Sequence, residues 1–314
     1  MCHTRRTKNR TKNAWRIIGG EIVPLGEFPH IVRMRKTLER HSQCQSSPCG
    51  VCGGTIIDDN WVLTAGHCCT THEGSKQVEN PSRLSFAVGA IFDKSCRYSG
   101  LCTGDKGSYY ASDWNSGKIF NATEVILHPK YRPKPLKWDY CLVKVEGHMI
   151  EGNQDASAVI LPEIHVKAHL SAESHLKIGS ECLVVGWGQT ENGLQSPDLL
   201  KASVKIYTND YCIKETAYSF KHVGHNQFCA GLERGRSDSC QGDSGGPLYC
   251  RTSMKDEFKQ YGIVSLGGKC GDANTPGIYA KTPSVSNWIN QVTKTVNNVK
   301  SVKTVKTMKG VAKC

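Results

Sequence analysis

Short apolar runs, rich in valine and isoleucine and separated by turn residues, recur along most of this 314-residue chain. Runs of this length bounded by glycine, proline, asparagine or aspartate are typical of β-strands. They lie at 54–57, 61–64, 84–88, 124–127, 141–145, 182–185, 201–206 and 261–264. Many short strands at this spacing predict an all-β barrel or sandwich.

Two C-terminal patterns differ from the strand pattern. Val285, Trp288, Ile289 and Val292 recur at the spacing of one helical face, which predicts a helix near the end of the folded region. Residues 297–314 repeat valine and lysine in near-triplets, and a period of three does not keep one face of an α-helix over many turns. We therefore expect a flexible, low-complexity tail there. The sequence has no apolar run of 18 residues, so we expect no membrane span.

The net charge of +12 belongs to the two ends of the chain. Residues 1–16 contribute +6 and residues 297–314 contribute +5, which leaves +1 for residues 17–296. Blocks of like charge with few large apolar residues are usually solvated tails. The nearly neutral body gives no reason to expect specific nucleic-acid binding.

Sixteen cysteines are too many for a protein of the reducing cytosol unless they bind metal. Their spacing lacks the paired CxxC or Cys/His pattern of zinc sites, so a disulfide framework in a secreted, extracellular protein is the better interpretation. Residues 1–16 lack the apolar core of a signal peptide. We expect a leader that precedes the sequence given, rather than export by another route.

Residues 238–247 read Asp-Ser-Cys-Gln-Gly-Asp-Ser-Gly-Gly-Pro. Glycines on both sides of Ser244 allow a sharp turn and a close approach of backbone to a substrate. Such a turn exposes Ser244 Oγ and points the backbone N–H groups of Gly242 and Ser244 at one spot, which is what an oxyanion needs. The alternative is a glycine-rich surface turn with an incidental serine.

Two further residues complete a chemical set with Ser244. His67 follows the apolar run 61–64, and a lone histidine in such a place is more often structural than catalytic. Asp139 precedes the run 141–145, where a partly buried carboxylate is costly unless it has a partner. Serine, histidine and aspartate together supply a nucleophile, its base and the group that orients the base.

These motifs, together with Ile-Ile-Gly-Gly at 17–20, resemble the chymotrypsin/trypsin family of serine proteases in the chain order His, Asp, Ser. The resemblance covers residues 17–296. It implies an all-β fold of two six-stranded antiparallel Greek-key β-barrels with a C-terminal α-helix. It also divides the chain into a basic activation segment (1–16), a protease domain (17–296) and a basic tail (297–314).

The resemblance implies a role for each site residue. Ser244 would be the nucleophile, His67 its base and Asp139 the group that orients His67, with an oxyanion hole formed by the N–H groups of Gly242 and Ser244. Asp238 would lie at the base of the specificity pocket and pair with an arginine or lysine of the substrate. The pocket walls would come from Ser265, Gly267 and Gly277.

Two residues depart from the family's usual pattern near that pocket. Leu266 stands where a tryptophan is usual, and Lys269 stands where a small residue is usual. Both affect the expected efficiency and subsite preference and leave the reaction class unchanged. Lys269 points either over the mouth of the pocket or into solvent, and we favour solvent.

The resemblance also implies activation by cleavage at Arg16–Ile17. The new Ile17 ammonium would pair with Asp243, so the chain as written is expected to be a zymogen. Its expected partners are protein or peptide substrates with arginine or lysine before the cut bond, an activating protease, and inhibitors of the serpin or Kunitz type.

The family's bridges account for eight cysteines: Cys52–Cys68, Cys182–Cys250, Cys212–Cys229 and Cys240–Cys270. Cys69 follows His67 and Cys141 follows Asp139, so if the triad forms we expect a fifth bridge, Cys69–Cys141. Cys44 with Cys49, and Cys96 with Cys102, are near enough in sequence to close small loops. Cys2 and Cys314 pair either with each other or with another chain.

No cofactor or metal is expected. The residues after Val88–Gly89 lack the glutamates that a calcium site would need. Asn121 begins a glycosylation sequon, as does Asn9 in the activation segment.

The sequence thus predicts a secreted trypsin-like serine endopeptidase that works through an acyl-enzyme. One alternative is a catalytically inactive, protease-fold binding protein. Another is a protease held on anionic glycans or membranes by its basic tails.

Overall fold

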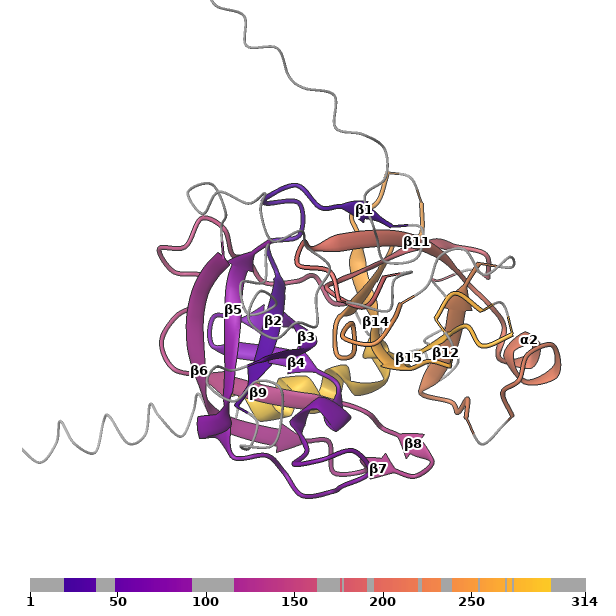
Figure 1. Cartoon of the computed structure of the whole chain (residues 1–314), viewed down its shortest axis with the longest axis horizontal. Helices are drawn as coiled ribbons and strands as arrows, with labels where there is room; N and C mark the ends of the chain where they lie inside the picture. Colours follow the sequence, from indigo (N-terminus) through magenta and orange to yellow (C-terminus); the bar gives the residue numbers. More distant parts are fainter. Residues whose placement is uncertain are drawn as a thin grey trace, which may run out of the picture.

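A computed structural model of the chain describes residues 20–37, 49–91, 116–162, 176, 178–190, 195–219, 222–232, 239–253, 255–268, 270–272 and 274–294 (Figure 1). The expected activation segment and basic tail lie outside these residues. Within them, no helix is long and apolar enough to cross a membrane.

Six antiparallel strands close the first barrel, drawn in indigo to magenta in Figure 1. They are β2 (Ile31–Lys36), β3 (Cys49–Asp58), β4 (Trp61–Thr64), β5 (Leu84–Ala90), β6 (Ser116–Leu127) and β9 (Cys141–Val145). Their order around the barrel is β2-β3-β4-β9-β6-β5. The interior holds apolar side chains of alternating strand positions, among them Val32, Met34 and Phe86.

The second barrel repeats this arrangement. Its strands are β10 (Glu181–Gly186), β11 (Leu200–Ile206), β12 (Gln227–Gly231), β13 (Pro247–Cys250), β14 (Lys259–Leu266) and β15 (Gly277–Lys281). They run in the order β11-β10-β13-β14-β15-β12, and the β11–β12 pairing closes the ring. The short strand β1 (Glu21–Ile22) pairs with the first residues of β11. Numbered along the chain, the strands of both barrels neighbour one another in the same Greek-key order, 1-2-3-6-5-4. The predicted fold class is confirmed.

Shorter elements lie between and after the strands. The 3-10 helices are η1 (Gly66–Cys69), η2 (Pro81–Arg83) and η3 (Thr282–Val285), β7 (Arg132–Pro133) pairs with β8 (Leu136–Lys137), and α2 is Asn209–Lys214. Thr208 caps α2 by accepting the N–H of Tyr211 at 2.8 Å, as threonine at this position commonly does.

The predicted C-terminal helix spans 286–294 and follows η3 directly. Val285 and Ile289 are buried in the core of the first barrel, and Trp288 and Val292 pack against that core. The helix therefore leaves the second barrel and returns to cover the first (yellow in Figure 1).

The two barrels meet along β3 and the turn before β13. A Cβ atom on Gly53 would lie 2.9 Å from Gly246 Cα, so this approach requires glycine. Thr55 Oγ1 donates to Gln260 Oε1 across the same boundary at 2.8 Å. The glycines of the Ser244 turn are therefore needed for barrel contact as well as for the turn itself.

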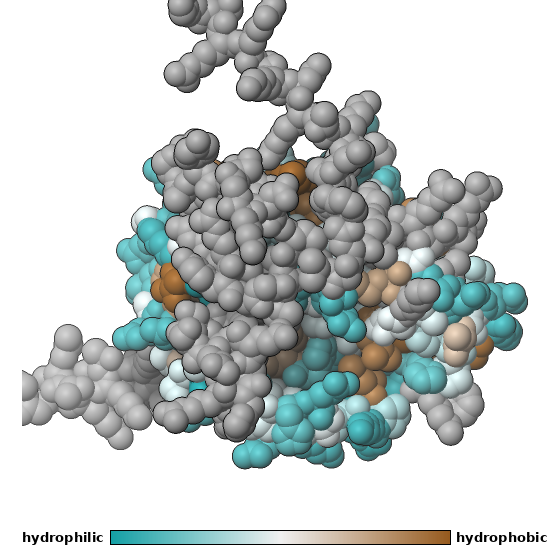
Figure 2. Space-filling model, in the orientation of Figure 1, coloured by the Kyte–Doolittle hydropathy of each residue, from teal (hydrophilic) through white to brown (hydrophobic). Residues whose placement is uncertain are grey.

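On the molecular face drawn in Figure 2, hydrophobic and hydrophilic side chains of the described residues are both visible in several places. Large apolar residues with exposed side chains, such as Leu25 and Ile178, are scattered along the sequence. Single exposed apolar residues of this kind are normal on a protein surface.

Candidate active site

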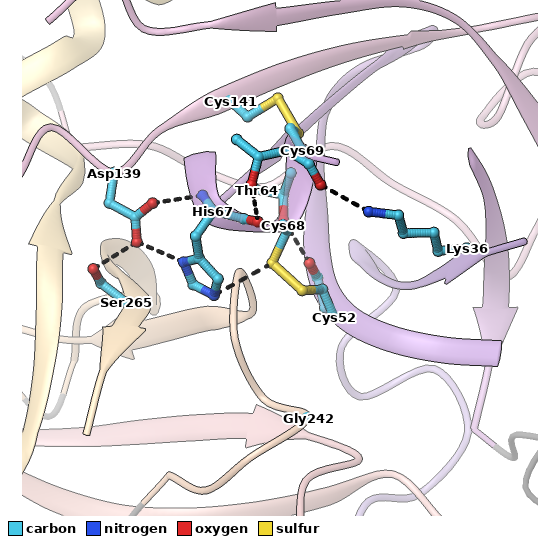
Figure 3. The surroundings of a disulfide bond; sticks show 12 residues. Lys36, Cys52, Thr64, His67, Cys68, Cys69, Asp139, Cys141, Gly242 and Ser265 are labelled. Atoms are coloured by element: carbon cyan, nitrogen blue, oxygen red, sulfur yellow. Dashed lines mark hydrogen bonds and ion pairs between the residues drawn. A yellow bond between two sulfur atoms is a disulfide. The ribbon is translucent and has the colours of Figure 1, made fainter. Parts of the chain in front are cut away.

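His67 lies in the tight turn η1, directly after β4. Disulfides hold this turn on both sides, because Cys68 is bonded to Cys52 on β3 and Cys69 is bonded to Cys141 at the start of β9. Figure 3 shows the His67 ring between the carboxylate of Asp139 and the Cys52–Cys68 disulfide. The turn is thus fixed to two strands of the first barrel.

Asp139 is fully buried and its carboxylate binds His67 twice. Oδ1 accepts the backbone N–H of His67 and Oδ2 lies against the ring Nδ1, each at 2.8 Å. Ser265 Oγ, from β14 of the second barrel, donates to Oδ2 at 2.7 Å. A buried carboxylate needs partners of this kind, and three donors meet that need here.

The electrostatics of this pair favour protonation of His67. Burial alone would lower the pKa of the imidazole, but the charge of Asp139 and its hydrogen bond outweigh burial and raise that pKa above its usual value. Because Nδ1 faces Asp139, the other ring nitrogen, Nε2, is free to accept a proton from a nucleophile. The His67 side chain is 23% exposed, so the imidazole is not fully enclosed by protein.

The backbone of the Ser244 turn is held from both barrels. The N–H of Gly53, next to Cys52, donates to the Ser244 carbonyl at 2.7 Å. On the other side the Gly245 N–H donates to the Val264 carbonyl at 2.8 Å, one residue before Ser265. Ser244 is therefore fixed between the segment bridged to the His67 turn and the segment bonded to Asp139.

Among the hydrogen bonds of the described residues there is none between Ser244 Oγ and His67 Nε2. The ring nitrogen lies 3.7 Å from Cys68 Sγ. In enzyme structures without a bound ligand such catalytic bonds are often long, and they tighten when substrate binds. The structure thus provides the framework of the predicted triad and one of its two hydrogen bonds.

Gly242 adopts φ of 98° and Gly245 φ of 78°, which are left-handed values that favour glycine. The Gln241 carbonyl accepts the Gln189 N–H at 2.8 Å. Since a trans peptide points its C=O and the following N–H in opposite directions, the Gly242 N–H faces away from Gln189. That N–H is one of the two predicted oxyanion donors.

Asp243 is completely buried beside Ser244. Its carboxylate accepts the N–H of Gly188 at 2.7 Å and of Cys240 at 2.9 Å. Burial raises its pKa to about 6, although both backbone bonds and the nearby charge of Arg33 act in the opposite direction. The predicted partner, Ile17, lies outside the described residues, as does Arg16.

The residues of the predicted specificity pocket are described in part. Asp238 and Lys269 lie outside the described residues. Gly277 is buried on β15, Gly267 has open space where a Cβ would be, and Leu266 packs against the cluster around the Cys212–Cys229 bridge. Leu266 therefore has its own packing role in place of the tryptophan that is usual in the family.

All five predicted bridges are present: Cys52–Cys68, Cys69–Cys141, Cys182–Cys250, Cys212–Cys229 and Cys240–Cys270. The other predicted cysteine pairings are not described by the structure, because Cys2, Cys44, Cys96, Cys102, Cys314 and the side chain of Cys49 lie outside the described residues.

Asn121 is exposed on β6, as a glycosylation site requires. Its occupancy stays a prediction.

Two groups in the described part of the chain bring three metal-ligand atoms within 4.8 Å of one another. One is Cys52, His67 and Cys68, whose sulfurs are joined in a disulfide and therefore are not thiolate ligands. The other is Asp59, His148 and Glu151 on the surface. Asp59 there already accepts backbone N–H groups of the neighbouring loop.

Sequence reasoning missed two contributions to the site. Ser265 appeared as a pocket wall, yet its hydroxyl binds Asp139. Arg33 received no role, yet it is buried against Gly242. A charged residue between the apolar residues Val32 and Met34 was the only signal for Arg33, and no signal local to Ser265 reveals its contact.

A family model described as Trypsin matches residues 17–91 and 100–289. The ovochymase of Halocynthia roretzi is 32% identical over 286 residues, which are 89% of this chain and 16% of that protein. Trypsin 5G1 of Aedes aegypti is 30% identical over 287 residues, 91% of this chain and 88% of that protein. Serine proteinase stubble of Drosophila melanogaster is 32% identical over 283 residues, 87% of this chain and 30% of that protein.

The chain thus spans a small part of ovochymase and of stubble, and most of the length of Trypsin 5G1. Its similarity to each of them extends over both barrels.

Proposed function

The chain belongs to the trypsin family, and from that premise we propose that it is a secreted serine endopeptidase that cuts peptide bonds after arginine or lysine. The observation that carries the proposal is the binding of His67 by Asp139. A buried carboxylate that holds both the backbone and ring Nδ1 of one histidine leaves Nε2 as a base for the adjacent Ser244 turn.

In this mechanism Ser244 Oγ attacks the carbonyl carbon of the substrate while His67 Nε2 takes the hydroxyl proton. Asp139 keeps the ring in the required tautomer and stabilises the imidazolium. The carbonyl oxygen becomes an oxyanion and accepts the N–H groups of Gly242 and Ser244. When the C–N bond breaks, the imidazolium protonates the leaving amine, and an acyl group stays on Ser244.

Water then attacks the acyl-enzyme by the same steps. His67 removes a proton from water, the resulting hydroxide attacks the acyl carbon, and the second tetrahedral intermediate uses the same oxyanion donors. Collapse of this intermediate returns the proton to Ser244 Oγ and releases the new carboxyl terminus. No metal or cofactor is needed for either half of the reaction.

Asp238 would give the preference for basic side chains, by pairing with the substrate's arginine or lysine at the base of the pocket. The Cys240–Cys270 bridge and buried Gly277 support a pocket at this place. Five disulfides support an oxidising, extracellular location, since such bonds are rare in the cytosol.

Cleavage at Arg16–Ile17 would switch the enzyme on. Asp243 supports this step, because its carboxylate is buried with a raised pKa and so lacks full compensation for its charge. The freed Ile17 ammonium would supply that compensation. Inhibitors of the serpin or Kunitz type would then act on the cleaved form.

The test is an assay of the chain cleaved after Arg16 on matched peptide amides with arginine, lysine or phenylalanine before the cut bond. We expect turnover of the first two substrates, none with Ser244→Ala, and none from Arg16→Gln after the same activating treatment. Turnover of the phenylalanine substrate alone would overturn the specificity. A folded, cleaved chain that turns over none of them would instead be an inactive binding protein.

A further inference from the structure

A buried arginine lies where the two barrels meet. On β2, Val32 and Met34 point into the core of the first barrel, so Arg33 between them points out of it, toward the second barrel. Arg33 is 1% exposed. Its Cα partner on β3 is Gly53, the residue whose N–H holds the Ser244 carbonyl.

The guanidinium of Arg33 reaches the turn that precedes Ser244. Nη1 donates to the Gly242 carbonyl at 2.8 Å, and Nη2 donates to Gln195 Oε1 at 2.9 Å. The guanidinium carbon lies 5.7 Å from the ring centre of buried Trp187. One planar fork therefore binds two segments of the second barrel at once, in a fixed geometry that the single ammonium of a lysine does not reproduce.

Stability alone gives a weak reason for this residue. Ile31, Ala87 and Trp187, which lie in the layer between the barrels with Arg33, are apolar. The charge of Arg33 also acts on buried Asp243, but two backbone N–H groups already bind that carboxylate. Taking a guanidinium out of water is costly, and apolar replacements of buried charged groups are often neutral or stabilising. The contacts of Arg33 therefore indicate a role at Gly242, whose carbonyl it binds.

The Gly242 N–H belongs to the same peptide group as the Gln241 carbonyl, and the Gly242 carbonyl belongs to the next peptide group. Both carbonyls are fixed. The Gln241 carbonyl is held by the Gln189 N–H, and the Gly242 carbonyl is held by Arg33. Gln195 also packs on the residue, since a Cβ on Gly242 would lie 2.7 Å from Gln195 Nε2. A glycine at φ of 98° has wide freedom of its own, so these contacts set the direction of its N–H.

We propose that Arg33 is a positioning residue for the oxyanion hole, which fixes the Gly242 carbonyl and so aligns the Gly242 N–H with the reacting oxygen. This inference rests on the proposed protease function and deepens it. Arg33 touches no reacting atom. It acts by keeping the donor in place before the negative charge develops, so that no reorganisation is needed in the transition state.

Because the donor acts on the developing oxyanion, its misplacement should lower kcat and leave KM nearly unchanged. Complete loss of one oxyanion donor lowers kcat by about 10²–10³-fold, so partial misplacement in Arg33→Met should lower it by about 10- to 100-fold. The affinity for a peptide boronic acid, whose tetrahedral adduct uses the hole, should fall with kcat. The affinity for a small amidine, which fills only the specificity pocket, should not.

The experiment uses chains cleaved after Arg16, with the new Ile17 terminus verified by mass spectrometry. Gln195→Leu provides a second variant at a half-buried position, in case Arg33→Met does not fold, and should lower kcat by less. Lys144→Met is the matched control, because it removes another buried cation. Lys144 pairs with Trp61 at the end of β9 remote from Asp139 and should keep the parent kcat.

A folded Arg33→Met or Gln195→Leu variant with the parent kcat and the parent boronate affinity would overturn the proposal. So would a parallel loss of boronate and amidine affinity, which would indicate general disturbance of the site. An inactive parent chain would instead contradict the proposed function. The two failures are therefore distinguishable.

Discussion

Asp139 connects more of the site than any other single residue described above. Its carboxylate binds the backbone and the ring of His67 from the first barrel and the hydroxyl of Ser265 from the second. Its charge also raises the pKa of the His67 imidazole. The orientation and the basicity of the proposed base thus depend on one buried group.

Replacing that carboxylate tests this dependence. In Asp139→Asn the charge that raises the pKa of His67 is gone, and the amide favours the wrong tautomer of the ring. We expect kcat to fall by about 10⁴-fold, a magnitude taken over from other members of the family. Because only neutral His67 acts as a base, kcat/KM falls as the pH drops through the pKa of His67, and this acid limb should move to lower pH in the variant.

The measurement is the pH profile of kcat/KM between about pH 5 and 9, the range in which histidine titrates. Asp59→Asn is a matched control, because Asp59 also binds a histidine, His148, but at the surface. Its profile should coincide with that of the parent. An acid limb that stays in place in Asp139→Asn would contradict the role given to Asp139.

Individual site residues could be predicted where their neighbours in the sequence indicated their role. The glycines around Ser244 and the aspartate before a strand predicted a reactive turn and a buried carboxylate. Ser265 and Arg33 gave no such signal, because their partners, Asp139 and Gly242, are 126 and 209 residues away in sequence. Contacts between the barrels exist only after both barrels have formed.

Among the elements, the 3-10 helix η1 depends most on covalent bonds. Cys69–Cys141 joins it to β9, the strand that follows Asp139, and the bridge is fully buried. A disulfide stabilises a protein mainly by restricting its unfolded chain, and more so for a longer loop. This bridge spans 72 residues and also fixes the relative position of His67 and Asp139.

A second bridge provides a matched comparison. Cys182–Cys250 spans 68 residues, is also fully buried, and joins β10 to β13 in the second barrel. Removing either bridge by a double alanine substitution should lower the free energy of unfolding by about 2–4 kcal/mol, measured with denaturant. Only removal of Cys69–Cys141 should also lower kcat/KM strongly. Equal activity losses in both variants would contradict the positioning role.

Strand prediction succeeded where a run was apolar and β-branched. Eight runs correspond to β3, β4, β5, β6, β9, β10, β11 and β14. The strands β2, β12, β13 and β15 had no such run. β2 includes Arg33, which the fold buries, and β12 and β15 are short strands that include glycine. Pairing with neighbours in a closed barrel stabilises these four strands more than their own propensity does.

At the scale of the whole molecule, the site lies between two barrels of the same topology. Each barrel supplies part of it: His67 and Asp139 come from the first, and Ser244, Ser265 and Gly242 come from the second. The C-terminal helix strengthens this association by packing on the first barrel. Four motifs in order predicted two barrels through the family resemblance. The strand pattern alone was compatible with either a barrel or a sandwich.

The proposed activation would involve the whole molecule, and the pKa of Asp243 predicts a pH dependence of stability that can be measured. In the folded chain its pKa is about 6, against an ordinary 3.8. Between these values the folded state binds more protons than the unfolded state, so the free energy of unfolding falls as the pH rises through this interval. A pKa difference of about two corresponds to a contribution of about 3 kcal/mol to the free energy of unfolding. This contribution is lost in full above about pH 6.

Asp243→Asn in the uncleaved chain should therefore lack this decline and differ from the parent in the pH dependence of its stability. Its amide keeps only one of the two oxygens that accept the Gly188 and Cys240 N–H groups, so a constant loss of stability at every pH is expected as well. Cleavage after Arg16 should shrink the difference, because the Ile17 ammonium would lower the pKa of Asp243. Denaturant unfolding at several pH values measures the effect, with Glu146→Gln at an exposed position as the control. Parallel curves for the parent and Asp243→Asn would contradict this account of the buried carboxylate.

The most direct test of the account is titration with a fluorophosphonate, which reacts with a serine only when a base and an oxyanion hole activate it. The labelled fraction and the labelled residue are measured by mass spectrometry in the cleaved chain, the uncleaved chain and cleaved His67→Ala. We predict close to one label per cleaved molecule, on Ser244, and far slower labelling of the other two. A folded, cleaved chain without a label, or with the label on another serine, would contradict the assignment of Ser244.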